Sequence, residues 1–322
     1  TNKPPEISNN MHIWLVDEAS MVGTKLMDAL LTKADAAGAK VVLIGDTKQL
    51  QAVDAGNMFK QLQDRGIMKT VRMDEVVRQR NPEYLDIVKD VSSKRIDSAF
   101  ERLSASDKII QIPDRGERIK AVISEYTTET SNQRILVTSR NSDRHELNHE
   151  IRSVLRSQGK LFGGDHTFTI REAKGLSPAE KHFAQAYSTD EIIYARKAGV
   201  IGRAGTEARI VNVDHDHHTV LAKTKDGNEH LIDLVKEGDK LNVYAEKERS
   251  FAKGDKIVFL KNDKMIDVNN GTTGFVKNID DYGNLTATIE TGKDVTFHLG
   301  HYPYIDHGYA VTTYKSQGQT AR

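Results

Sequence analysis

An apolar run that ends in two adjacent carboxylates constrains the fold of this chain more than any other feature. Residues Ile13 to Val16 are typical of a buried strand, and Asp17 and Glu18 follow them directly. Such a strand delivers its acidic groups to the carboxyl edge of a parallel sheet. An aspartate at that edge can hold the magnesium ion of a bound nucleotide, and the next glutamate can orient an attacking water.

A second run of the same kind follows. Residues Val41 to Ile44 repeat the apolar pattern and lead into the polar segment 45–53, which contains Gln49. Between the two runs, residues 24–37 carry apolar side chains at a helical spacing, and Gly38 ends that helix. We therefore expect a β-α-β unit over residues 11–45, followed by a helix near 57–65 and a short strand around 70–73. This pattern predicts an α/β fold with a parallel sheet.

Composition limits the class of protein. The chain has 322 residues and equal numbers of acidic and basic ones, so its net charge is zero and only local charge can argue for nucleic acid. It has no cysteine, which excludes disulfides and thiolate metal sites and fits a cytoplasmic location. No apolar run is long enough to cross a membrane, so we expect no membrane insertion. Its first residues, without an initiator Met, are typical of a piece of a longer polypeptide.

The segment 131–160 carries a local excess of positive charge, with six basic and three acidic residues. A predicted strand over 134–138 leads here into a helix from residue 144 to about 159. We expect basic side chains of this segment to contact the phosphates of a single nucleic-acid strand; they are Arg140, Arg144, Arg152 and Arg156. The alternative is that the helix exposes a solvated charged face.

Residues 161–300 change to strand-like alternation interrupted by turn pairs such as Asp226-Gly227 and Asn270-Gly271. Gly205-Thr206, Ile210 and Asn212-Val213-Asp214 recur as Gly271-Thr272, Val276 and Asn278-Ile279-Asp280 at one constant offset. This repeat predicts two tandem small-barrel modules, over about residues 185–240 and 250–300. Because α/β character returns after residue 301, the β-rich region is predicted to be an insertion in a second α/β domain.

Four segments in order, at residues 15–23, 44–56, 76–79 and 308–320, resemble the RecD-like branch of superfamily 1 helicases. The likeness covers nearly the whole chain. It implies RecA-like motor-domain segments: residues 1–80 would be the C-terminal half of a first RecA-like domain. Residues 81–160 and 301–322 would belong to a second one, interrupted by the β-rich insertion.

The resemblance also implies a role for each motif residue. Asp17 would hold Mg²⁺, Glu18 would act on the water, Gln49 would sense the γ-phosphate, and Arg78 would stabilise the charge of phosphoryl transfer. At the other end of the chain, Thr312, Lys315 and Gln317 would couple the nucleotide cleft to single-stranded DNA. The simpler alternative for Arg78 is a helix cap or a surface residue.

Two further pieces, Ser139 to Arg144 with Leu147-Asn148, and Gly254 to Phe259 with Asn270-Gly271, look like the helicase portions of conjugative relaxases of F-like plasmids. That likeness implies a monomer in the cytoplasm of a bacterial donor cell, with single-stranded DNA as one partner. It also implies an internal translocation signal, recognised by the type IV secretion coupling protein, that directs the protein into the recipient cell.

The sequence departs from the motor pattern. No GxxxxGK[ST] phosphate loop is present, since the Gly-Lys pairs at 159–160 and 292–293 are followed by Leu161 and Asp294. The final helicase motif is expected beyond Arg322, and Tyr314 stands where the family usually has His. ATP and Mg²⁺ belong to the intact helicase family, and we expect no cofactor and no ATP hydrolysis in this chain.

Three functions stay open at this point. The first is a fragment of a conjugation relaxase that binds single-stranded DNA and serves as a translocation signal. The second is a piece of an active ATP-dependent 5'-3' DNA helicase, and the third is a protein-interaction domain without DNA contact. A cluster of three histidines and two aspartates at 214–218 resembles a metal site, but it lies at a predicted hairpin turn, where polar residues are common.

Overall fold

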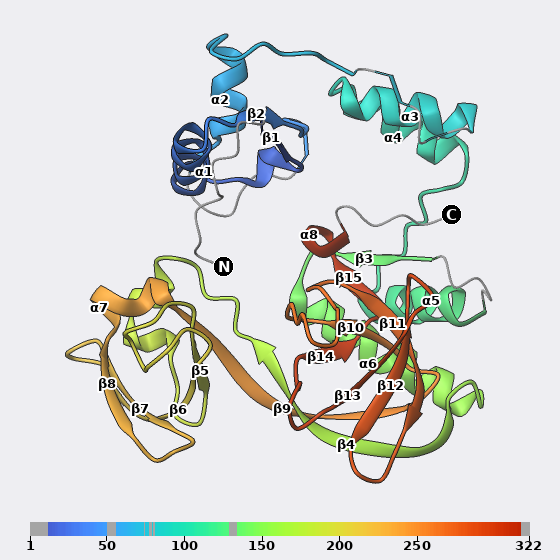
Figure 1. Cartoon of the computed structure of the whole chain (residues 1–322). Coiled ribbons are helices and arrows are strands. Elements are labelled where there is room, and N and C mark those ends of the chain that lie inside the picture. The colour runs from blue at the N-terminus through green and yellow to red at the C-terminus, as the bar shows by residue number, and fades with distance from the viewer. Residues whose placement is uncertain are drawn as a thin grey trace. The chain divides into compact units, whose positions relative to one another are not determined.

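The computed structural model describes residues 12–49, 56–73, 75–76, 79, 81–128 and 134–316 of this chain (Figure 1). These residues divide into two compact units, 1–114 and 115–322. The sequence placed its first domain boundary at 80/81 instead, so the assignment of residues 81–114 to a RecA-like domain stays a proposal. Each unit is described by itself below.

The N-terminal unit begins with the predicted strand-helix-strand pattern. Its strands β1 (Ile13–Val16) and β2 (Lys40–Leu43) pair in parallel, with Ile13 opposite Lys40, and helix α1 (Thr24–Ala36) connects them. Met27 and Ala34, seven positions apart on one helix face, are the buried residues of α1. The 3-10 turn η1 (Ala19–Met21) follows β1, and helix α2 (Met58–Asp64) is capped by the side chain of Asn57. Residues 70–73 are irregular and exposed, so the short strand expected there is absent.

Two antiparallel helices complete this unit. Helix α3 (Pro82–Ser92) begins at the N-cap Asn81, whose side chain accepts from the N–H groups of Glu83 and Tyr84, and α4 (Ile96–Ala105) follows after a short turn. The carboxylate of Asp90 joins them, because it accepts from Arg95 at 2.6 Å and from Arg102 at 2.9 Å. These contacts connect the end of α3 to the turn and to α4.

The C-terminal unit contains a small parallel α/β layer built from distant parts of the chain. Strand β3 (Leu136–Thr138) pairs in parallel with β15 (Ala310–Thr312), with Thr138 opposite Thr312. Helices α5 (Arg115–Thr128) and α6 (Asn141–Ser157) pack on them through a core that includes Ile123, Ile151 and Tyr309. The short helix α8 (Thr313–Ser316) follows β15.

The residues between α6 and β15 form two antiparallel sheets. The six-stranded sheet has the order β4-β9-β5-β6-β7-β8. Its strands are β4 (Phe162–Ala173), β5 (Ile192–Ala195), β6 (Glu207–Asp214), β7 (Thr219–Thr224), β8 (Glu229–Asp233) and β9 (Leu241–Lys253). The five-stranded sheet has the order β13-β12-β11-β10-β14. Its strands are β10 (Lys256–Phe259), β11 (Thr273–Ile279), β12 (Asn284–Ile289), β13 (Asp294–His298) and β14 (Ile305–His307). Short helical turns η2 (Glu180–His182), η3 (Ala184–Ala186), α7 (Leu234–Glu237) and η4 (Gly238–Lys240) line the connections.

The sequence repeat is visible as two similar strand sets, which we call module 1 (β5–β8) and module 2 (β10–β13). A β-bulge lies between Ile210 and Asn212 in module 1, and another lies at the equivalent place in module 2, between Val276 and Asn278. Strands β7 and β8 of module 1 correspond to β12 and β13 of module 2, each pair aligned from its first residue. Both sheets have a linear strand order, so the barrel closure expected from the sequence is not among the described strand pairs.

Each module has a hydrophobic core, and residues of β5 and β9 connect the two. Ile210 and Val220 pack in the core of module 1. Ile192 and Tyr244 of the same sheet instead pack in the core of the module 2 side, with Phe259. The ammonium group of Lys261 lies 4.0 Å from the ring centroid of Tyr194 and 4.2 Å from that of Tyr304. The two modules are therefore in direct contact.

Candidate functional site

In the N-terminal unit, the acidic residues of the first motif lie at the carboxyl edge of the β1–β2 pair. The N–H of Ile44 donates to the carbonyl of Val16, and the N–H of Ala19 donates to the carbonyl of Ile44, both at 2.8 Å. The segments that leave the two strands are therefore in direct contact. Gly45 is required for this approach, because a Cβ there would lie 3.0 Å from the backbone nitrogen of Ser20.

Three acidic residues, Asp17, Glu18 and Asp46, follow the two strands at this edge. Glu18 has a left-handed backbone conformation, with φ of 50°, and its N–H donates to the carboxylate of Asp17 at 2.9 Å. Asp17 is exposed, and among the described residues its carboxylate accepts only this one hydrogen bond. After β2, Asp46 accepts from the side chain of Gln49 at 3.3 Å. An exposed carboxylate at a strand end suits a hard cation such as Mg²⁺. Arg78, the other residue expected at this site, lies outside the described residues.

In the C-terminal unit, a second carboxyl edge brings together residues that are far apart in the sequence. Because β3 and β15 run in parallel, Arg140 and Lys315 follow neighbouring strand ends, and the hydroxyl of Thr313 donates to the carbonyl of Thr138 at 3.3 Å. Arg140 is exposed and pairs with Asp143 at 3.0 Å, and Thr312 is half-buried. Lys315 is exposed overall, but desolvation of its ammonium group, followed by the nearby charge of Arg144, lowers its pKa. Gln317 lies outside the described residues.

The arginines of α6 do not form the solvated charged face that was the alternative expectation from the sequence. Arg144 is buried and donates to Asp306 at 3.2 Å and to Glu172 at 3.0 Å. Arg152 donates to Asp255 at 3.0 Å and to Asp165 at 2.6 Å. Arg156 donates to the carbonyls of Leu161 and Gly163 at 3.1 and 2.7 Å. Phosphate contact was expected for these three arginines, but their partners within the chain already use their donors.

These arginines instead fasten the β-rich insertion to the α/β layer. Asp255, which is 0% exposed, accepts from Arg152, from the hydroxyl of Tyr309 at 2.6 Å and from the N–H of Ala252 at 2.6 Å. It opens module 2, whereas Tyr309 immediately precedes β15. Sequence reasoning missed this network, because Arg152 and Asp255 are 103 positions apart and nothing local marks either as buried.

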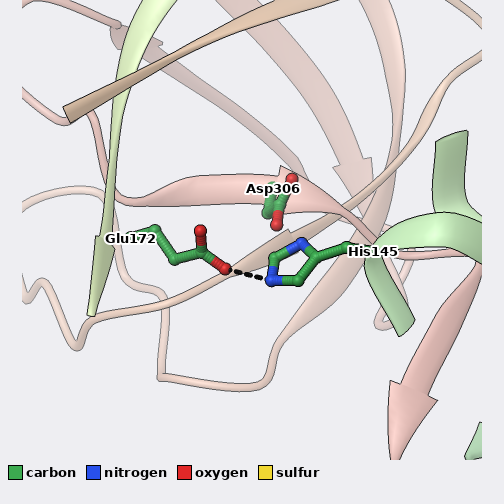
Figure 2. Close-up of side chains that lie close together, drawn as sticks. All are labelled: His145, Glu172 and Asp306. Atoms are coloured by element: carbon green, nitrogen blue, oxygen red, sulfur yellow. Dashed lines mark ion pairs between the residues drawn. The ribbon is translucent and has the colours of Figure 1, made fainter. Parts of the chain in front are cut away.

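His145, Glu172 and Asp306 lie close enough together to suggest a metal site (Figure 2). The Nε2 atom of His145 lies 2.6 Å from Glu172, and the ligand atoms of all three lie within 4.8 Å of one another. Positive charges surround both carboxylates, however, since Lys247 lies 2.7 Å from Glu172 and Arg249 lies 3.1 Å from Asp306. The cluster is therefore better described as an ion-pair network than as a metal site.

The titration of this network follows from its contacts. Burial alone would raise the pKa of Glu172, but hydrogen bonds from His145 and Lys247 outweigh it and lower the pKa to about 2. Burial alone would also raise the pKa of Asp306. The charges of Arg249 and Arg144 outweigh this effect and lower that pKa. Both carboxylates therefore stay ionised at neutral pH.

The histidines at 214–218 form a hairpin turn, as the alternative interpretation predicted. Asp214 accepts from the N–H groups of Asp216 and His217, both at 3.0 Å, and its carboxylate lies 2.8 Å from the ring of His217. His218 instead packs against Phe183. Within the described ranges, this turn provides no grouping with metal-ligand geometry.

Comparison with known proteins identifies the relatives of this chain. Residues 2–114 match the model of an AAA domain family. Over 99% of the chain, the conjugal transfer protein TraA of Agrobacterium fabrum is 26% identical. The multifunctional conjugation protein TraI of Escherichia coli K12 is also 26% identical over 99% of the chain. Over nearly its whole length, the chain is similar to the conjugal transfer proteins TraA and TraI.

This similarity confirms the resemblance to conjugative relaxases. The chain spans about a fifth of the length of these relatives, 22% of TraA and 20% of TraI. A crystal structure of Bacteroides Pif1 bound to single-stranded DNA aligns with 96% of this chain and 62% of that one, at 16% identity and a TM-score of 0.49. No helix in the described part of the chain is long and apolar enough to span a membrane.

Proposed function

We propose that this chain is a helicase-like segment of a conjugation protein that binds single-stranded DNA and carries a translocation signal for type IV secretion. The observation that carries the DNA part is the β3–β15 edge, where Arg140, Thr312 and Lys315 come from opposite ends of the C-terminal unit but follow adjacent parallel strands. At such an edge the exposed Lys315 suits a phosphate contact, and a phosphate would compete with Asp143 for the exposed Arg140. Gln317 belongs to the same proposed set through its motif.

The recruitment part of the proposal rests on the inserted β region. It contains two similar modules in direct contact through β5 and β9, and buried ion pairs hold it on the α/β layer. A rigid body of this kind can present one fixed surface to a secretion coupling protein. The parent would then act as a monomer in the donor cytoplasm and pass into the recipient cell.

A second candidate is a working ATP-dependent helicase of which this chain is a part, and the geometry at Asp17 and Glu18 favours it. Within the proposal, Asp17 holds Mg²⁺, Glu18 and Gln49 face the nucleotide, and Arg78 completes the set in the intact parent. The chain itself has no phosphate loop to cradle the β- and γ-phosphates. Phosphate release from ATP that rises with added single-stranded DNA would favour this motor over the binding fragment.

The proposed recruitment function is tested by transfer of a passenger. The whole chain is fused to a recombinase, and transfer into recipient cells is scored by recombination at a reporter during mating. Transfer above that of the recombinase alone is expected. A fusion that is expressed and folded in the donor but never reaches the recipient would rule out the translocation signal.

A further inference from the structure

One face of module 1 combines a cavity, exposed aliphatic side chains and basic groups. Strand alternation divides the side chains of β6–β8 between two faces. Ile210, Val220 and Ala222 point into the module 1 core. We call the opposite side the outer face; it carries Arg209, Val211, Leu221, Lys223 and Leu231.

One end of the outer face is buried against module 2, and the other end is exposed to solvent. Where it reaches β5 and β9, Ile192 and Tyr244 are buried in the core of the module 2 side. Farther along, Leu231 is 72% exposed and Val211 is 42% exposed. Leu221 and Leu231 are paired in register across β7 and β8, so they form one aliphatic patch.

A cavity of about 250 Å³ opens on the same face, and Lys223, which lines it, lies two positions from Leu221 on β7. Ile192, Ala208 and Val211 contribute apolar lining, whereas the polar lining includes four cationic side chains and the single carboxylate of Glu207. Two of these cations, Arg209 and Lys223, lie directly opposite each other in the strand register, an arrangement that like charges make unfavourable.

Two of the four cations that line this cavity form close ion pairs with carboxylates of the chain, and the other two do not. Arg171 pairs with Glu207, and Arg209 pairs with Glu246 at 2.7 Å. Lys223 has only a loose contact of 3.8 Å with Glu229. Lys225 is exposed and forms no ion pair within the described residues. Positive charge thus remains available at the end of β7.

Module 2 provides an internal comparison for the same face. Because β12 and β13 align with β7 and β8 from their first residues, Thr286 and Thr296 replace the leucine pair, and their hydroxyls lie 2.9 Å apart. Thr288 and Asp294 replace Lys223 and Glu229, and the hydroxyl of Thr288 donates to Asp294 at 2.7 Å. This face satisfies its own polar groups. The fold therefore does not require exposed leucines and unneutralised lysines at these positions.

We propose that the outer face of module 1 is a docking site for an acidic peptide segment with aliphatic anchors. An aliphatic side chain fills the cavity on the same face as Leu221 and Leu231, and flanking carboxylates pair with Lys223 and Lys225. The chemistry favours a peptide over nucleic acid, because no aromatic ring of the described residues lines the cavity and could stack on a base. In the proposed recruitment function, such a peptide would belong to the secretion partner, and the biological role of this docking site rests on that proposed function.

Peptide binding to the whole chain tests this assignment. The probe is a fluorescein-labelled peptide that alternates leucine and glutamate, followed by fluorescence anisotropy. We expect saturable binding that the Lys223→Glu/Lys225→Glu double variant weakens about tenfold or more, equivalent to about 1.4 kcal/mol. Leu231→Thr, which gives module 1 the residue that module 2 carries, is expected to weaken binding too. Lys264→Glu, an exposed cation of the module 2 side, is the matched control and leaves binding unchanged.

Two further probes separate the possible results. A peptide that alternates serine and glutamate binds more weakly if the aliphatic anchor matters, and equal binding overturns the anchored mode. Loss of oligothymidine binding in the double variant, with peptide binding intact, would assign the face to nucleic acid instead. Failure of the leucine-glutamate peptide while the passenger fusion still transfers would contradict the docking site alone. Peptide binding without passenger transfer would contradict the recruitment function alone.

Discussion

At the scale of single residues, Asp255 joins the β-rich insertion to the α/β layer. Its carboxylate is fully buried and accepts from Arg152, Tyr309 and Ala252. Asp255→Asn weakens these hydrogen bonds in a fully buried place, although Arg152 keeps its contact with Asp165 at 2.6 Å. We therefore expect the substitution to lower the free energy of unfolding by about 1.5–3 kcal/mol, as for a lost hydrogen bond to a charged group.

Urea unfolding followed by circular dichroism measures this effect. The matched control is Asp267→Asn, because Asp267 also pairs with a single cation, Lys293, but its side chain is 78% exposed. An exposed pair contributes at most about 1 kcal/mol. Equal losses in the two variants would contradict a structural role for the Arg152–Asp255–Tyr309 network.

The ion-pair network around Glu172 predicts a pH dependence. Its folded-state pKa of about 2 lies below the ordinary value of 4.5, so the ionised carboxylate stabilises the fold above that ordinary value. This contribution is lost as the pH falls from about 4.5 towards 2. We expect Glu172→Gln to be less stable than the wild type at pH 7, with the difference shrinking across that acidic window.

Urea midpoints measured at a series of pH values check this prediction. Glu125→Gln is the control, because Glu125 is exposed on α5 and has no ion pair among the described contacts. A difference between Glu172→Gln and the wild type that persists unchanged at the lowest pH would show that Glu172 contributes through packing and not through its charge.

At the scale of elements, the parallel pair β3–β15 is the proposed DNA contact. Arg140→Ala and Lys315→Ala each remove one exposed cation from its carboxyl edge. Each variant should weaken binding to oligothymidine, and each should reduce the slope of log affinity against log salt by about 0.7. Fluorescence anisotropy over a range of sodium chloride concentrations measures this slope. A slope that matches the wild type, as expected for the control Lys264→Ala, would remove that residue from the DNA contact.

Elements with strong local patterns could be predicted from the sequence, whereas long-range charge pairing could not. The spacing of Leu26, Met27, Leu30 and Leu31 and the stop at Gly38 correctly predicted α1 between two parallel strands. The repeat around Asn212 and Asn278 predicted two similar modules, and the structure has two similar strand sets, with β-bulges at equivalent places that the sequence did not predict. Arg144 gave no local sign that it is buried, because its partners Glu172 and Asp306 come from strands 28 and 162 positions away.

At the scale of the whole molecule, the chain combines two carboxyl edges with a β-rich insertion. One edge carries Asp17 and Glu18, and the other carries Arg140 and Lys315. The similarity to the conjugal transfer proteins TraA and TraI extends over all three parts, and the chain spans about a fifth of the length of those relatives. We propose that such a segment holds single-stranded DNA without hydrolysing ATP.

The affinity of the unmodified chain for fluorescein-labelled oligothymidine, measured without nucleotide at increasing salt, tests whether the segment holds single-stranded DNA. We expect saturable binding at low salt and a linear fall of log affinity with log salt, because cationic side chains displace counterions from phosphates. Absence of binding at low salt, or an affinity that does not change with salt, would contradict this proposal.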